Sequence, residues 1–364
     1  MTHSRDVDLE PIPRGRVGTW LATFDPGYFA AVMATGIVSI GARMLGLRAL
    51  SDVLLGCAGL AFVVLAAAYI ARAVRFPRRF MQSLVDPSIA VAYFTLVAGT
   101  NVLGAALVPF GLWIPSLLLG LAAFAVWLVL TYGLFSSIVL AAHRPQLRDI
   151  NGLWLVWVVG TQSVAAHAAV LSPVVPWPNG RQTLAATAVL FWGVGIILYL
   201  VLVVIILLRL LTIETTPAEM TPAYWILMGA AAISVHAAAG ILSAGSSTRM
   251  PLLTGMHPFV VGLSVVLWSF GSWLIPILLL FEVWRYAVRR YSWRYEPKLW
   301  DIVFPLGMYT VASYGLGRAV EFGFMAQLAA VWMWISVASW CLVVALMMLA
   351  FVTSLRRTGV RHSG

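Results

Sequence analysis

The sequence predicts an all-α integral membrane protein with ten transmembrane helices, arranged as five helical hairpins. Three observations predict this class. Of the 364 residues, 62% are hydrophobic and 10% are charged, whereas about 25% of the residues in soluble domains are charged. The apolar residues fall into ten long runs, each able to supply the roughly 20 residues that cross a bilayer as a helix. The basic residues are divided unequally between alternate loops.

The ten runs are bounded by charged residues, prolines or turn residues. Their centres lie near Met33, Phe62, Val97, Val126, Gly160, Ile197, Ile233, Trp268, Met308 and Cys341. We expect residues 1–24 to form a mobile cytoplasmic arm, residues 25–355 the ten-helix transport domain, and residues 356–364 a short cytoplasmic tail. The arm does not resemble a signal peptide, because no apolar core with a small-residue cleavage site precedes the first run.

The charge distribution predicts the orientation. The formal net charge is +10, from 23 Lys and Arg against 13 Asp and Glu. If the N-terminus and alternate loops share one side, that side carries 18 of the 23 basic residues and the other side carries 5. The positive-inside rule then predicts an inner-membrane (plasma-membrane) protein with both termini in the cytoplasm. The basic residues are scattered thinly between apolar runs, which disfavours nucleic-acid binding.

Composition alternates along the chain. The odd-numbered runs are rich in small and weakly polar residues, whereas runs 2, 6 and 10 are bulky and apolar. Small residues let helices approach closely in lipid, and hydroxyl groups suit the wall of a narrow, wet conduit. We therefore expect the odd-numbered helices to surround a central pore, although the same stripes could serve only to pack helices together. The predicted pore lining is Thr35, Ser39, Thr95, Gly99, Ser163, His167, His236, Gly307 and Thr310.

Charged residues are placed near the ends of the runs and not near their middles. This placement argues against a carboxylate proton relay or a metal site within the membrane. On the predicted outer side, Arg43, Arg249 and Arg318 would form a vestibule that concentrates anions, unless they are ordinary interfacial arginines. Pro305 is expected to kink the ninth run. Phe304 beside it could close a narrow pore by dewetting, or could simply pack.

Two histidines lie within the runs. Ser163 precedes His167 by one turn, which suggests a hydrogen-bonded structural histidine. Alternatively, His167 and His236 could line the pore and respond to protons, or act together as axial haem ligands. These alternatives leave two other functions open, namely a haem-binding membrane oxidoreductase and a proton-coupled dicarboxylate symporter in which His236 titrates.

Two segments resemble motifs of a known family. DPGYFAAVMATGIVSIG, residues 25–41, resembles the first-span signature of the tellurite-resistance/dicarboxylate transporter family, which includes slow-type anion channels and malic acid and sulfite transporters. WDIVFPLGMYTVAS, residues 300–313, is similar to that family's ninth-span motif. The resemblance implies five quasi-symmetric hairpins, homotrimers with one pore per subunit, and a phenylalanine gate that Phe304 matches. It also implies transport of small anions or of C4-dicarboxylates such as malate, without enzymatic activity, metal or cofactor.

Overall fold

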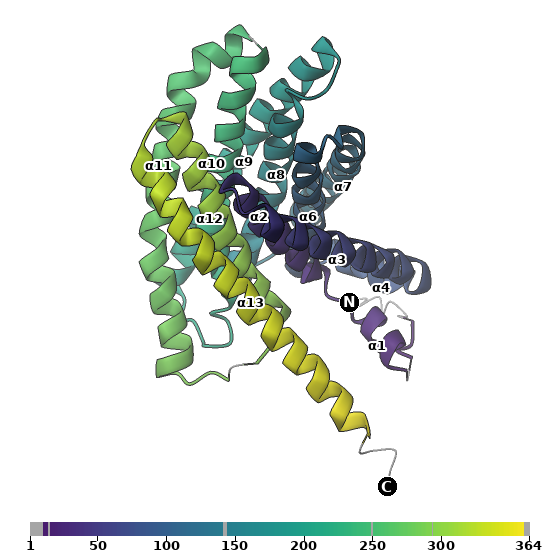
Figure 1. The fold of residues 1–364 in the computed structure, drawn as a ribbon. Coiled ribbons are helices and arrows are strands. Elements are labelled where there is room, and N and C mark those ends of the chain that lie inside the picture. The colour runs from purple at the N-terminus through teal and green to yellow at the C-terminus, as the bar shows by residue number, and fades with distance from the viewer. Residues whose placement is uncertain (1–9, 14, 141–143, 249, 293, 360–364) are drawn as a thin grey trace.

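The computed structural model describes residues 10–13, 15–140, 144–248, 250–292 and 294–359. Every regular element within these ranges is helical, and none of them is a strand (Figure 1). The all-α class predicted from the sequence is therefore confirmed for this part of the chain.

Nine helical segments in the described ranges are long and apolar enough to cross a membrane. They are Pro26–Met44, Arg48–Arg75, Pro87–Phe110, Trp113–Leu140, Gly152–Leu171, Pro178–Thr212, Pro222–Gly245, Pro251–Val288 and Gly323–Thr353. The predicted run near Met308 is the helix α12 (Trp300–Ala319), which is 20 residues long but not among the nine. Its small and weakly polar residues make it less apolar than the others, so a count of ten spans stays a prediction.

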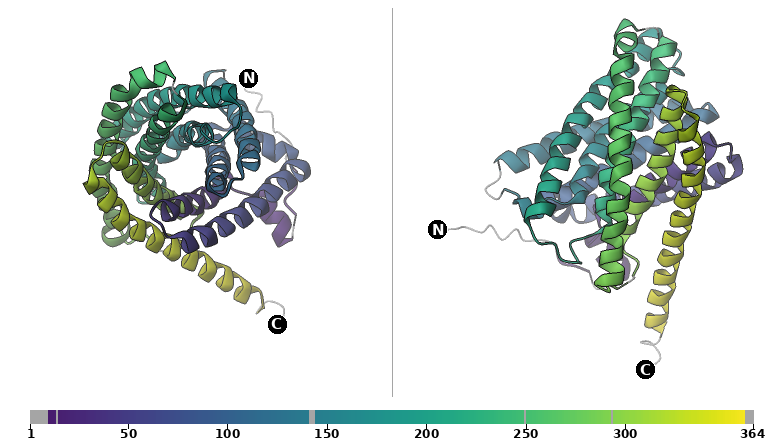
Figure 2. Two further views of the ribbon diagram at one scale, coloured as in Figure 1. Left: turned by 45° about the horizontal axis from the view of Figure 1, so that its top comes forward. Right: turned by 90° about the vertical axis from the view of Figure 1, so that its left-hand side faces the viewer.

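The long helices fall into two groups by their contacts. The inner helices are α2 (Ala30–Met44), α6 (Phe94–Leu107), α8 (Val156–Leu171), α10 (Ile226–Thr248) and α12. The outer helices are α3 (Arg48–Arg75), α7 (Trp113–Leu140), α9 (Pro178–Thr212), α11 (Pro251–Glu282) and α13 (Gly323–Gly359). Each inner helix packs against the outer helix that follows it, and against two other inner helices in the closed order α2, α6, α8, α10, α12. Figure 2 shows this ring and the outer helices around it.

Burial separates the same two groups. In the segments that contain α2, α6, α8 and α10, between 67% and 89% of the most apolar stretch is buried. In the segments of the outer helices the buried share is only 11–39%. Large apolar side chains such as Leu60, Leu121 and Leu211 are exposed on the outer helices. Such surfaces suit contact with lipid, because the exposure of an apolar helix face to water is energetically unfavourable.

Each inner helix is preceded by a short 3₁₀ turn. These turns are η1 (Pro26–Phe29), η2 (Val91–Tyr93), η5 (Gly152–Leu155), η6 (Pro222–Trp225) and η8 (Pro297–Leu299). Proline opens three of them, and Pro87 opens α5 (Pro87–Ala90), which leads into η2. Proline suits this position because its missing N–H would have no helical partner there. The side chain of Asp25 caps η1 by accepting a hydrogen bond of 2.8 Å from the Gly27 N–H, and Asn151 caps η5 in the same way.

A glycine lies at each of the five contacts between neighbouring inner helices. A Cβ at any of these positions would come within about 3.0 Å of an atom on the next helix, closer than real Cβ atoms usually pack. The pairs are Gly36 with Val102, Gly160 with Phe94, Gly240 with Ala169, Gly229 with Pro305, and Gly307 with Ile37, at 2.7, 2.9, 3.0, 2.8 and 2.9 Å. The small residues of the inner helices therefore let the ring close tightly.

The remaining elements are short: α1 (Arg16–Ala22), α4 (Pro77–Val85), η3 (Val108–Phe110), η4 (Leu147–Asp149) and the π-helical turn η7 (Val283–Val288). In the predicted N-terminal arm, the Glu10 carboxylate accepts hydrogen bonds of 2.9 and 3.3 Å from the N–H groups of Arg78 and Arg79. Residues 1–9 and 14 of that arm lie outside the described residues, as do residues 360–364 of the predicted tail. The helix α13 extends to Gly359.

Candidate functional site

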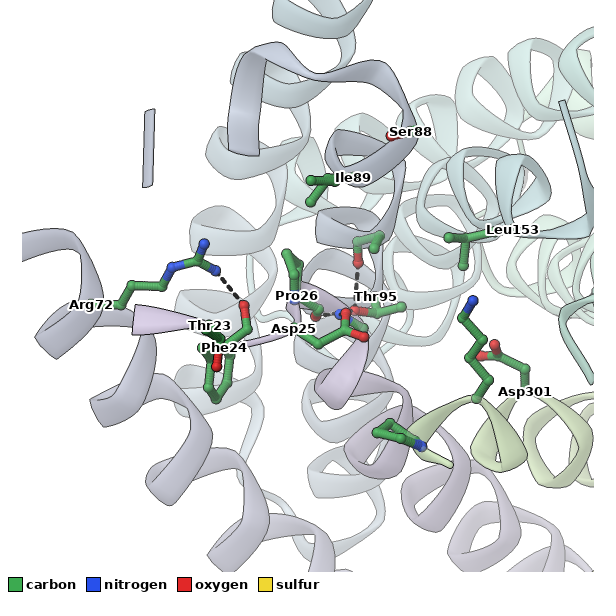
Figure 3. A pocket seen from close by; sticks show the side chains of 14 residues that line it. Thr23, Phe24, Asp25, Pro26, Arg72, Ser88, Ile89, Thr95, Leu153 and Asp301 are labelled. Atoms are coloured by element: carbon green, nitrogen blue, oxygen red, sulfur yellow. Dashed lines mark hydrogen bonds between the residues drawn. The ribbon is translucent and has the colours of Figure 1, made fainter. Parts of the chain in front are cut away.

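A cavity of about 420 Å³ lies where α2, α6, α8 and α12 begin, and we call it the proximal cavity. Exposed Thr23, Ser88 and Lys298 line it together with buried Thr95 and Asp301. Exposed and buried lining residues together mean that the cavity runs from the surface toward the ring. Figure 3 shows Asp301 on α12 across from Asp25, at the start of η1.

Four charged side chains line the proximal cavity, two of each sign. Arg72, at the end of α3, is buried, and its Nη1 donates a hydrogen bond to the Phe24 carbonyl. The Asp25 carboxylate accepts the hydrogen bond that caps η1. The Asp301 side chain differs, because the residue is only 3% exposed and no hydrogen bond or ion pair joins its carboxylate to any other described residue. The formal charge of these four groups is zero when both carboxylates are ionised.

Two further cavities lie at the opposite end of the ring, and we call them the distal cavities. Their volumes are about 440 and 240 Å³, and Met44, Val170 and His236 line both of them. Arg318 lines the larger cavity and Arg43 the smaller one. No carboxylate is among the described residues that line either cavity. The charged residues that line these cavities in the described part of the chain are therefore cationic.

The predicted vestibule arginines lie at this distal end, as far as the structure describes them. Arg43 pairs with Asp52 at 3.0 Å, and its guanidinium carbon lies 4.1 Å from the centre of the Phe110 ring. The Arg318 guanidinium carbon lies 6.0 Å from the centre of the Tyr314 ring. Arg249 lies outside the described residues. The exposed pair with Asp52 partly neutralises Arg43, so Arg318 is the less compensated of the two.

Phe304 lies between the two ends and is fully buried. Its direction follows from its neighbours on α12, because successive residues of a helix turn by about 100°. Pro305 faces Gly229 of α10, and Gly307 faces Ile37 of α2. Phe304 projects between these two contacts. The opposite side of α12 faces the outer helices, so Phe304 points toward the interior of the ring.

The same face of α12 reaches both ends of the ring. Asp301, one turn before Phe304, lines the proximal cavity, and Gly315, three turns after it, lines a distal cavity. These two residues are about 20 Å apart along the helix. Phe304 therefore lies on the one face of α12 that connects the proximal cavity with the distal cavities.

Three of the predicted pore-lining residues line cavities: Thr95 at the proximal end, and Ser39 and His236 at the distal end. The others occupy helix contacts. Thr35 accepts a hydrogen bond of 3.0 Å from the Trp340 indole N–H of α13. The hydroxyl of Thr310 lies 3.3 Å from that of Ser336, also on α13. Gly99, Ser163, His167 and Gly307 pack against neighbouring helices.

The geometry of α12 explains why the predicted stripe leaves the interior. Phe304, Gly307 and Thr310 follow one another in steps of three, and each such step rotates the face by about 60°. The stripe therefore begins at the interior with Phe304, faces α2 at Gly307 and faces α13 at Thr310.

His167 is held in a complete hydrogen-bond network. Its Nε2 lies 2.8 Å from the Ser116 hydroxyl, and its Nδ1 lies 3.0 Å from the Asn101 side-chain oxygen. The amide nitrogen of Asn101 in turn donates to the Ser163 hydroxyl at 2.9 Å. Both ring nitrogens are thus engaged by protein groups, so neither is free to bind haem iron. Ser163, which the sequence suggested as a partner, reaches His167 only through Asn101.

His236 is in a different situation. It lines the distal cavities, and its Nδ1 is buried without a hydrogen-bond partner among the described residues. The haem hypothesis required both histidines, and the engaged nitrogens of His167 do not fit it. The hypothesis of a titrating His236 stays a prediction.

Two features of the site were missed from the sequence. Asp301 lies at the start of the run near Met308 and Arg72 at the end of the run near Phe62, and neither is among the predicted site residues, yet both are buried beside the proximal cavity. The spacing of three between Asp301 and Phe304 could have indicated that the carboxylate and the ring share one face. No comparable signal exists for Arg72, because its position depends on how α3 packs.

Comparison with known proteins agrees with this architecture. Residues 23–348 match the family described as voltage-dependent anion channel (SLAC1). An uncharacterized membrane protein of Mycobacterium tuberculosis is 37% identical over 162 residues, which cover 44% of this chain and 81% of the relative. An uncharacterized transporter of Methanocaldococcus jannaschii is 24% identical over 332 residues, 88% of this chain and 92% of the relative.

A relative with a named activity is more distant. The sulfite efflux pump SSU1 of Trichophyton rubrum is 24% identical over 354 residues, which cover 90% of this chain and 91% of the pump. The resemblance predicted from residues 25–41 and 300–313 is confirmed by the family match. With its long apolar helices and this match over most of its length, the chain is a multi-pass membrane protein that belongs to the voltage-dependent anion channel (SLAC1) family of transporters.

Proposed function

We propose that this protein conducts small anions through the ring of α2, α6, α8, α10 and α12, with Phe304 as the gate. In this proposal all five inner helices cross the membrane, including α12. The anion moves between the proximal cavity and the distal cavities, and the Phe304 side chain blocks the narrow part of the path between them. C4-dicarboxylates such as malate are the alternative cargo.

One observation carries the proposal. Cavities enter the ring from both ends, and a fully buried aromatic ring occupies the face of α12 that joins them. An apolar ring in a narrow passage excludes water, and an anion cannot leave water without a replacement for its hydration shell. The passage is therefore closed while Phe304 holds this position.

Electrostatics and similarity support an anionic cargo. The distal cavities are lined by Arg43 and Arg318, which would raise the local concentration of anions. The similarity to a sulfite efflux pump points to the same class of solute. We further propose that both termini are cytoplasmic in the plasma membrane, and that the protein forms homotrimers with one pore per subunit, as the family resemblance implies.

The test is anion flux after removal of the ring. Phe304→Ala should raise the flux of nitrate or chloride into proteoliposomes by about tenfold or more, which corresponds to a barrier lower by about 1.4 kcal/mol or more. The measurement compares initial rates at equal protein content, with malate as a third anion.

Phe94→Ala is the matched control. Phe94 is as deeply buried as Phe304, but it packs on Gly160 at the contact between α6 and α8. Its removal leaves a cavity of the same size and a similar loss of stability, without opening the path along the ring axis. Equal flux in wild type and Phe304→Ala would refute the gate, and equal increases in both variants would mean that loosened packing causes the flux.

A further inference from the structure

We infer that Asp301 determines which anion charge the proposed pore accepts, because its carboxylate sets the sign of the proximal mouth. The inference rests on the proposed anion conduction. It concerns selectivity between monovalent and divalent anions, and not whether the path conducts.

The position of Asp301 is the first step. The carboxylate lies in the first turn of α12, lines the proximal cavity and precedes Phe304 by three residues on the interior face. An anion that enters from this end passes Asp301 immediately before it meets the gate.

The second step is that the carboxylate has no hydrogen-bond or ion-pair partner among the described residues. The residue is 3% exposed, yet no described residue donates a hydrogen bond to its carboxylate or forms an ion pair with it. Buried carboxylates are normally hydrogen-bonded or paired. A buried carboxylate that is left open toward a cavity can act on whatever solute enters that cavity.

The third step is the charge balance of the mouth. The charged groups that line the proximal cavity together with Asp301 are Asp25 before η1, Lys298 on η8 and Arg72 on α3. Two further groups lie on other elements packed against α12. The Tyr224 hydroxyl accepts a hydrogen bond from Arg209, and the Glu282 carboxylate accepts one from the Trp225 indole N–H.

Glu282 does not belong to this mouth. It lines a separate apolar cavity with Ile302 and Leu306, on the outward side of α12. The mouth therefore has a formal charge of zero with Asp301 ionised, and of +1 once Asp301 is protonated or neutralised.

These observations give a direct consequence for selectivity. Charged side chains at a pore mouth select ions by sign and valence, and a fixed negative charge repels a divalent anion twice as strongly as a monovalent one at the same distance. Ionised Asp301 thus favours monovalent anions. Acid at this mouth neutralises it and admits divalent anions.

The experiment measures nitrate and sulfate flux in proteoliposomes of the full chain at several pH values. Asp301→Asn should raise the ratio of sulfate to nitrate flux by about tenfold at alkaline pH, where the wild-type carboxylate is ionised. It should also remove the rise in sulfate flux that acid produces in wild type. Asp301→Glu keeps the charge and should keep the wild-type ratio.

Two other variants complete the test. Lys298→Gln removes an exposed cation from the same cavity and should lower the sulfate-to-nitrate ratio, because the mouth becomes more negative. Glu214→Gln removes an exposed carboxylate in the loop after α9 and should change nothing.

The outcomes separate the two proposals. A sulfate-to-nitrate ratio that stays at the wild-type value in Asp301→Asn overturns the role of Asp301 while anion conduction stands. So does a wild-type ratio that acid leaves unchanged, which can be measured even if Asp301→Asn fails to fold. The absence of any anion flux, in wild type and in Phe304→Ala, overturns anion conduction and this inference with it.

Discussion

Buried polar residues in this protein are of two kinds, and the difference separates structural from functional candidates. His167 shares a closed network with Asn101 and Ser116, in which each ring nitrogen has a partner. Asp301 and His236, by contrast, line cavities. The Nδ1 of His236 has no hydrogen-bond partner among the described residues, and no described residue forms a hydrogen bond or an ion pair with the Asp301 carboxylate. A satisfied network fixes the packing of helices, whereas an unpaired group beside a cavity is available to a solute. A sequence shows both kinds simply as polar residues in apolar runs.

The closed network predicts a cost for removing its central amide. Asn101→Ala leaves the Nδ1 of His167 without its acceptor and the Ser163 hydroxyl without its donor, both in a buried site. The free energy of unfolding should fall by about 1–3 kcal/mol, the usual cost of a buried group left unsatisfied.

The measurement is denaturation in detergent micelles, followed by tryptophan fluorescence. Thr187→Ala serves as the control, since that part-exposed residue donates its one hydroxyl hydrogen bond, as far as the structure describes the chain, to the Thr183 carbonyl within α9. A loss of stability in Asn101→Ala no larger than in the control would mean that the network adds nothing to the fold.

Helices are the scale at which the sequence was most informative. The alternation between small-residue runs and bulky runs corresponds to the alternation between buried and exposed helical segments. Small residues and large aliphatic residues differ in how closely another helix can approach, so composition alone separates a packed helix from a lipid-facing one. The direction in which a single side chain points was less predictable. Repeated steps of three along α12 turned Thr310 toward Ser336 of α13.

Replacement of glycine by alanine should change the free energy of unfolding in opposite directions at a ring contact and on an outer helix. Gly229→Ala places a Cβ 2.8 Å from the Cγ of Pro305, and a proline ring cannot turn aside. Overpacking of this kind should lower the free energy of unfolding by about 1–3 kcal/mol. Gly193→Ala in α9 meets no atom within 4 Å, and should raise it by about 0.5–1 kcal/mol, because alanine favours the helix.

Both glycine variants can be measured in the same micelle assay. If Gly229→Ala were as stable as Gly193→Ala, then α10 and α12 would not be in close contact in the membrane. The proposed position of Phe304 between these contacts would then lose its support.

The whole molecule shows where inference from a sequence stops. The length of the apolar runs predicts a multi-pass protein, because a segment that crosses a bilayer must be apolar. The charge bias predicts its orientation, because cytoplasmic loops are rich in Lys and Arg. The cavities at the two ends of the ring require the packing of several helices, which no local pattern encodes. Asp301 shows this limit, since it lies at the end of an apolar run and yet lines a cavity together with Lys298 and with Asp25 and Arg72 from distant parts of the chain.

The status of α12 decides the topology of the whole chain, and a labelling experiment can settle it. The other long helices are clearly apolar, but α12 is less so. If α12 crosses the membrane, the loop before it and the turn after it lie on opposite sides. Single cysteines are introduced at the exposed positions Ser292 and Phe322, in a protein whose own Cys57 and Cys341 are replaced by alanine, because both are exposed.

A membrane-impermeant maleimide applied to intact cells should then label Phe322→Cys and spare Ser292→Cys, which should react only after the cells are opened. This result follows from ten spans with the Lys298 side in the cytoplasm, where the basic residues gather. Labelling of both positions from the same side would mean that α12 does not cross the membrane. The proximal and distal cavities would then not open to opposite compartments, and Phe304 could not gate a path between them.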